Sequence, residues 1–184
     1  MEETKIVEQT RQWIREIVIG LNLCPFAQRV FDGDRIRYVV SDSKDEASLL
    51  DSLRRELLLL AGTPIQEIET TILIHPAVLA DFGDYNEFIG PAEELLEELD
   101  LVGIVQLATF HPEYQFAGTK PSAVENYTNR SPYPMLHLLR EASISAVATD
   151  ADELLAIPKR NVQTLRQLGL ADILQRMKKI KKAD

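Results

Sequence analysis

One cysteine and two histidines are the residues best suited to nucleophilic and proton-transfer chemistry. Cys24 follows an amphipathic segment, and His111 and His137 lie in two polar motifs further along the chain. A thiolate near a cation is a nucleophile, and a neutral imidazole can take its proton. The sequence therefore predicts His111, His137 and Cys24 as candidate catalytic residues. The alternative for Cys24 is a buried structural thiol, because Leu23 and Phe26 give it an apolar setting.

Arg130 precedes a predicted helix start and suggests an anion site. The dipeptide Ser-Pro at 131–132 is typical of a helix N-terminus, with serine as the cap and proline in the first turn. Free N–H groups, the positive dipole end and the guanidinium would together bind a phosphate or a carboxylate. Polar residues at helical spacing, His137 among them, would face either the ligand or solvent. The predicted ligand-binding residues are Arg130, Asn129, Asn126, Tyr114, Tyr127, Tyr133 and Arg140.

The segment 111–130 has no helical or strand periodicity. Such long segments inside a domain are usually functional or disordered. This one carries aromatic residues that need somewhere to pack, which favours an ordered loop that lines a site. It also follows a predicted strand, where ligands of parallel sheets commonly bind.

Metal and cofactor binding are not expected. His75, His111 and His137 lack the short paired spacing of zinc motifs, and His75 sits between Ile74 and Pro76 at a strand end. The sequence contains no glycine-rich phosphate loop, no G-x-S-x-G elbow and no C-x-x-C pair. We therefore expect neither a metal nor a cofactor.

The elements that must position these residues follow from hydrophobic periodicity and capping patterns. Thr4 and Gly20 are the expected ends of the first helix, and Ser43 with Glu46 forms a capping-box pattern before the second. Strands are expected over 35–40, 70–75 and 103–110, with the last apolar enough to be central. Helices are expected over 4–19, 48–62, 84–99, from 131 onward, over 158–168 and over 171–180.

Alternation of strands and helices favours parallel pairing through crossover connections. The expected fold is α/β, with a short, mainly parallel sheet of three or four strands covered by helices and an all-helical C-terminal part. A mixed sheet with an extra strand near 114–117 remains an alternative.

Composition narrows the class of protein. The 184 residues carry a formal charge of −9 and one cysteine, which fits a single domain over 1–184 without a disulfide. No apolar run approaches the ~20 residues of a membrane span, and the N-terminus lacks a signal-peptide block, so we expect a cytoplasmic protein that does not engage membranes. The acidic body argues against nucleic-acid binding. The oligomeric state stays open.

The basic C-terminal tail, 176–184, is an exception to the acidic charge. It holds five basic residues and one acidic residue. Cations there would complement a helix C-terminus; the alternative is contact with RNA or anionic lipid.

Three motifs resemble a known family. The segments NLCPFA (22–27), FHPEYQFAG (110–118) and ENYTNRSPYPMLHLLRE (125–141), with IPKRN (157–161), are similar to an uncharacterised bacterial family catalogued only as a domain of unknown function. The resemblance spans nearly the whole chain. It implies a stand-alone protein of this size and assigns no reaction. The motif positions include Cys24, His111, Arg130, His137 and Arg140, whereas His75 lies outside them.

Two functions follow. The first is an enzyme or enzyme-like binder of a small anionic metabolite, held by Arg130 and served by His111 or His137. The alternative is a non-catalytic binding or assembly module in which the polar motifs fix the long loop through buried hydrogen bonds. The two are distinguished by whether these side chains converge on an open cavity or bond to backbone.

Overall fold

A four-stranded mixed sheet forms the centre of the computed structural model, which describes residues 2–146 and 151–182. β1 and β2 pair in parallel, as expected, whereas β4 runs antiparallel to both β2 and β3. The sheet is therefore not mainly parallel. In spatial order the strands are β1 (Ile36–Val40), β2 (Thr70–Ile74), β4 (Met135–Arg140) and β3 (Val105–Phe110).

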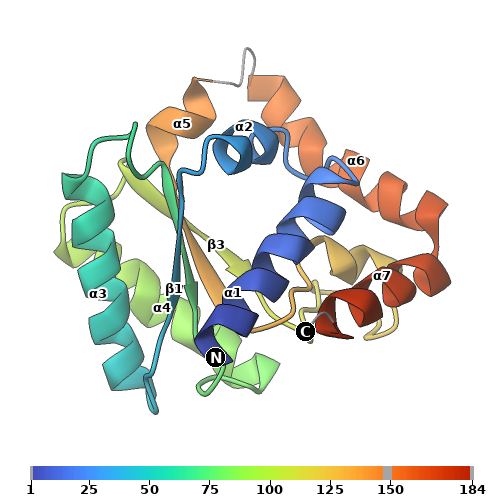
Figure 1. The fold of residues 1–184 in the computed structure, drawn as a ribbon, viewed down its shortest axis with the longest axis horizontal. Coiled ribbons are helices and arrows are strands. Elements are labelled where there is room, and N and C mark those ends of the chain that lie inside the picture. Colours follow the sequence, from blue (N-terminus) through green and yellow to red (C-terminus); the bar gives the residue numbers. More distant parts are fainter. Residues whose placement is uncertain (1, 147–150, 183–184) are drawn as a thin grey trace.

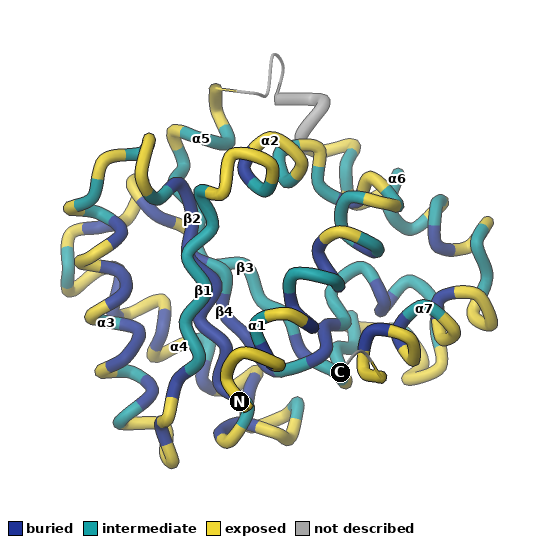
Figure 2. Tube along the Cα trace, viewed as in Figure 1, coloured by how far each residue is buried: buried dark blue, intermediate teal, exposed yellow. Residues whose placement is uncertain are grey.

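Helices cover both faces of this sheet (Figure 1). α3 (Glu46–Gly62) and α4 (Phe82–Glu98) pack on one face, where Leu73, Leu136 and Leu138 are buried. Ile72, Ile74 and Met135 point to the opposite face because successive strand side chains alternate. Figure 2 shows the central strands as the most buried part of the molecule. The opposite face is covered by α1 (Glu2–Trp13), η1 (Ile14–Ile19), α6 (Ala151–Leu168) and α7 (Leu170–Lys182).

The predicted first helix is confirmed, with one change in its ends and one in its pitch. It begins at Glu2 rather than at a Thr4 cap and continues from Trp13 as a wider π-helical turn until Gly20. α3 is likewise present, but its capping box is formed by Asp45 and Ser48, two residues later than the predicted pair. The strand after α4 is confirmed but lies at the edge of the sheet instead of its centre.

Residues 131–141 differ most from the sequence prediction. A helix was expected from Ser131, but 131–134 are in neither a helix nor a strand, 135–140 form β4, and the short helix α5 (Glu141–Ser145) begins at Glu141. Two prolines explain the error, since the residue before each proline is pushed out of the helical region and Tyr133 precedes Pro134. The helix N-terminus predicted beside Arg130 therefore does not exist, and the fourth strand lies here rather than near 114–117.

The remaining helices lie around this core. Pro158 falls inside α6 rather than at its start, and Gly169, with a φ of +84°, separates α6 from α7. Residues 176–182 of the basic tail belong to α7, while 183–184 lie outside the described residues. No helix in the described part is long and apolar enough to cross a membrane. Two short helices complete the fold, α2 (Ala27–Asp32) and η2 (Val124–Thr128).

Candidate functional site

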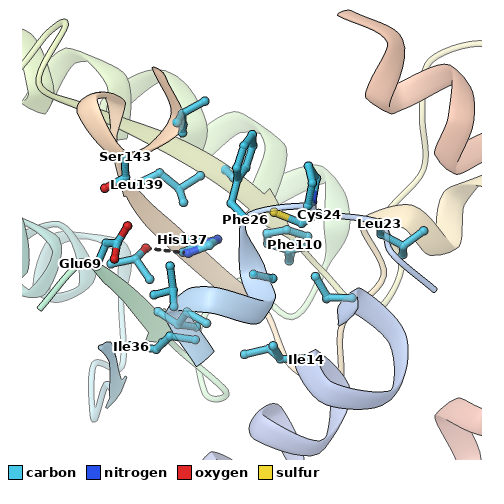
Figure 3. Close-up of a pocket in the computed structure, with 18 of the residues that line it drawn as sticks. Ile14, Leu23, Cys24, Phe26, Ile36, Glu69, Phe110, His137, Leu139 and Ser143 are labelled. Carbon is cyan, nitrogen blue, oxygen red and sulfur yellow. Dashed lines mark hydrogen bonds between the residues drawn. The ribbon is translucent and has the colours of Figure 1, made fainter. Parts of the chain in front are cut away.

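A mainly apolar cavity of about 290 Å³ lies on the sheet face opposite α3 and α4 (Figure 3). β2, β4 and β3 form its floor, and η1, the turn before α2, α5 and α6 contribute to its walls. Its volume lies near the lower end of small-molecule sites. Most of the lining is apolar: Trp13, Ile14, Val18, Leu23, Phe26, Val30, Ile36, Ile72, Phe110, Leu139, Ile144 and Ile157.

His137 is the imidazole that lines this cavity. It projects from β4, and its Nε2 lies 2.7 Å from the Oγ1 of Thr70 on β2. That hydroxyl donates its single hydrogen to the carbonyl of Leu138, 2.6 Å away. Nε2 must therefore carry the proton and donate to Thr70, since the hydroxyl has no second hydrogen to give. Nδ1 is left as an acceptor with no hydrogen-bond partner among the described residues.

Burial keeps this imidazole neutral. Because the charged form would lose its hydration, burial lowers the pKa of His137 to about 4. At neutral pH the cavity thus contains an uncharged ring whose acceptor nitrogen lies among apolar groups.

Cys24 lines the same cavity from the turn before α2. Burial raises the pKa of its thiol, and the N–H groups of Phe26 and Ala27 and the charge of Arg160 act in the opposite direction with less effect. The resting thiol is therefore protonated. Figure 3 shows the sulfur beside Phe26 and Phe110, across the cavity from Glu69 and Ser143.

Arg140 also borders the cavity, but its guanidinium is largely engaged by backbone. Nη2 donates to the carbonyls of Leu60 and Thr63, at the end of α3, and to that of Ile68. Arg140 thereby fixes the connection between α3 and β2. Of the predicted site residues, the structure brings together Cys24, His137 and Arg140.

The other predicted catalytic residue, His111, lies away from the cavity. Its ring is fully buried, with Nε2 3.1 Å from the carbonyl of Leu79 and Nδ1 accepting from the N–H of Glu113. It packs against Tyr85, as does His75. Thus the three histidines do not converge, and no group of metal-ligating side chains occurs in the described residues.

Arg130 and the two asparagines fix the long loop. Arg130 donates from Nε to the carbonyl of Tyr114 (3.0 Å) and from Nη2 to that of Pro121 (2.8 Å). Asn126 is fully buried and accepts from the N–H of Phe116 and the hydroxyl of Thr119. Its amide donates to Lys120, and the amide of Asn129 donates to the carbonyl of Thr109. These contacts match the sequence-based alternative in which polar motifs bond to backbone.

The three predicted tyrosines also have packing partners outside the cavity. Tyr114 packs on Phe82, with ring centroids 5.1 Å apart. The guanidinium carbon of Arg130 lies 4.7 Å from the ring centre of Tyr127, and the hydroxyl of Tyr133 donates to Gln9.

Comparison with protein families gives a match that agrees with the motif resemblance. The model of a family described as "Protein of unknown function (DUF1415)" matches residues 5–175. The chain belongs to the DUF1415 family. Comparison with curated proteins and with solved structures gives no significant match. In this DUF1415 chain, the motif 22–27 lines the cavity with most of its residues, whereas the motif 110–118 contributes only Phe110.

Sequence reasoning missed four polar residues of this DUF1415 site. Glu69, Thr70, Gln106 and Ser143 all line the cavity. Thr70 and Glu69 lie at the start of a strand, and Ser143 follows one, so position alone gave no chemical signal. The register of β2 with β4 brings Thr70 opposite Leu139 and next to His137. That register depends on a strand that the sequence had suggested to be a helix.

Proposed function

We propose that this protein binds a small, largely apolar molecule in the cavity, with one hydrogen bond donated by the ligand to Nδ1 of His137. The observation that carries the proposal is the Thr70 contact, which fixes the proton on Nε2 and leaves Nδ1 as an acceptor without a partner among the described residues. An acceptor in apolar surroundings favours a ligand that supplies a donor, because desolvation without a hydrogen bond is costly.

The anionic ligand predicted from the sequence has lost its geometric basis at Arg130. No helix begins after this residue, and its guanidinium is bonded to two carbonyls. The cavity lining also includes Glu69, whose Oε2 would meet an anionic head group directly, although Arg29 and Arg35 offset its charge. A neutral ligand is therefore the form that this lining favours.

Two probes that share a naphthalene body and differ by one O-methyl group test the proposal. 2-Naphthol donates a hydrogen bond and 2-methoxynaphthalene does not, and both offer an aromatic body for the apolar walls. We expect 2-naphthol to bind about 10-fold more tightly, as measured by ligand-observed NMR titration, since one well-formed hydrogen bond contributes roughly 1.5 kcal/mol. His137→Phe should abolish that difference. Gln106→Ala, an exposed polar position in the same lining, is the matched control and should keep it. Equal affinities for the two probes in the unaltered protein would reject the proposal.

Thiol-dependent acyl transfer is a second candidate, favoured by the presence of Cys24 and His137 in one cavity. In this reaction the Sγ of Cys24 would bond to the carbonyl carbon of an ester while Nδ1 of His137 takes the thiol proton. The proton would pass to the departing alkoxide, and water would later cleave the thioester to acid and thiol. Incubation with p-nitrophenyl acetate should give an acetyl mass increase that Cys24→Ser prevents and His137→Phe slows. Absence of acylation would leave the protein a binder only.

A further inference from the structure

One end of the cavity carries two buried oxygen atoms that form no hydrogen bond with a described residue. The Oε2 of Glu69 and the Oγ of Ser143 are both inaccessible to solvent and have no hydrogen-bond partner, and both residues line the cavity. Figure 3 shows them at the end away from Cys24 and Leu23. Buried polar atoms nearly always have a partner, so two that share a cavity wall indicate a bonding partner supplied from outside the chain.

The charge of Glu69 is already balanced by arginines. The carboxylate is 1% exposed; Arg29 donates to its Oε1, and Nη1 of Arg35 lies 3.1 Å from Oε2. Arg35 neutralises the charge of this carboxylate but forms no hydrogen bond with Oε2. That oxygen can therefore still accept a hydrogen bond. Arg140, which also senses the Glu69 charge, adds a further cation nearby.

This charge arrangement determines which head group fits. An ammonium would meet three guanidinium groups around one carboxylate, and a carboxylate would meet the Oε2 of Glu69 directly. A neutral group avoids both repulsions. Because Glu69 can only accept while Ser143 can also donate, the fitting group donates one hydrogen bond and accepts another.

We infer that Glu69 and Ser143 form a head-group subsite that binds a neutral donor–acceptor group, a primary carboxamide or a hydroxyl, of the apolar ligand. In the carboxamide case an N–H donates to Oε2 of Glu69, and the carbonyl accepts from the hydroxyl of Ser143. The inference rests on the proposed function and adds the chemical class of the ligand's polar end. It assigns a binding role to two residues that the sequence motifs do not include.

Three probes with one aromatic body test the subsite. 2-Naphthamide is neutral, 2-naphthoate is anionic, and 2-(aminomethyl)naphthalene is cationic at pH 7. The unaltered protein should bind the carboxamide at least 10-fold more tightly than either charged probe, as measured by ligand-observed NMR titration. Ser143→Ala should weaken carboxamide binding about 5-fold. Ser145→Ala, an exposed position of the same helix, is the control and should have no effect.

A stability measurement separates loss of ligand contact from loss of fold. The Ser143 hydroxyl has no partner to lose, so Ser143→Ala should leave the melting temperature of the free protein unchanged or raised. Equal binding of the three probes, or carboxamide binding that is insensitive to Ser143→Ala, would overturn the inference. If 2-naphthol still binds in a manner that depends on His137, the proposed function survives that outcome. If no naphthalene probe binds at all, the proposed function fails first.

Discussion

Thr70 orients His137 across the β2–β4 pair. Its Oγ1 lies 2.7 Å from Nε2 and also donates to the carbonyl of Leu138 in the adjacent strand. One hydroxyl thus joins a backbone acceptor of the sheet to the imidazole of the cavity. The consequence is a ring whose tautomer is set by the fold rather than by solvent.

The first prediction concerns this tautomer. His137 should carry its proton on Nε2 and remain neutral at pH 5, because burial holds its pKa at about 4. Nitrogen-15 NMR of the imidazole rings should report an unprotonated Nδ1 from neutral pH down to pH 5. Thr70→Val, which keeps the side-chain shape, should allow the Nδ1–H tautomer to appear. A His137 titration near pH 6.5 in the unaltered protein would contradict the prediction.

The second prediction concerns acid stability. His75 is 1% exposed, its Nε2 has no partner among the described residues, and burial lowers its pKa to about 4. The folded pKa lies below the unfolded value near 6.5, so the contribution to stability is complete above pH 6.5 and is lost as the pH falls toward 4. Linkage gives a loss of about 2 kcal/mol between pH 7 and pH 5 from this residue.

Urea unfolding at the two pH values measures this loss. His75→Phe keeps a ring against Tyr85 and removes the titrating group, so the variant should lose about 2 kcal/mol less than the unaltered protein between pH 7 and pH 5. An identical pH dependence in both proteins would exclude His75 as a source of acid sensitivity.

The third prediction separates Arg130 from ligand binding. Its guanidinium joins Tyr114, Pro121 and the ring of Tyr127, all within the long loop. Arg130→Ala should therefore lower the free energy of unfolding by about 1–2 kcal/mol, because two carbonyls lose a donor. Binding of 2-naphthol should stay unchanged. A large loss of 2-naphthol affinity at unchanged stability would instead place Arg130 in the ligand site.

Local sequence patterns predicted the type of secondary structure correctly where all residues of a segment favour the same type. The apolar stripe of the first helix and the β-branched run at 70–74 gave the correct element type. Segment 135–140 did not, because His137 and Arg140 at helical spacing imitate an amphipathic helix face. In the structure, His137 pairs with Ile72 of β2 on one side and with Ala108 of β3 on the other. This pairing makes the segment a strand, and such long-range pairing has no local signature in the sequence.

The site was predictable only in part for the same reason. Cys24 and His137 stand out by chemical type, and both line the cavity. Asn126 and His111 stand out equally, yet their polar atoms bond to the loop and to the segment before α4. Residue type alone cannot separate a side chain that binds a ligand from one that satisfies buried backbone, because both tasks need the same hydrogen-bonding groups.

The last prediction concerns the reactivity of Cys24. Burial raises the pKa of its thiol, so little thiolate forms at neutral pH. We expect iodoacetate to alkylate the native protein at least 10-fold more slowly than the urea-unfolded chain at pH 7.5, measured by intact-protein mass spectrometry. N-Phenylmaleimide should react faster than iodoacetate relative to the same unfolded reference, since the apolar walls admit a neutral aromatic reagent and give a carboxylate no replacement for its hydration. Saturating 2-naphthol should slow both reactions.

Cys24 is the only cysteine in the chain, so Cys24→Ser is the control that should show no labelling. Native and unfolded rates that coincide for iodoacetate would show that the thiol is freely exposed to solvent, which would contradict the burial of Cys24 in the cavity wall.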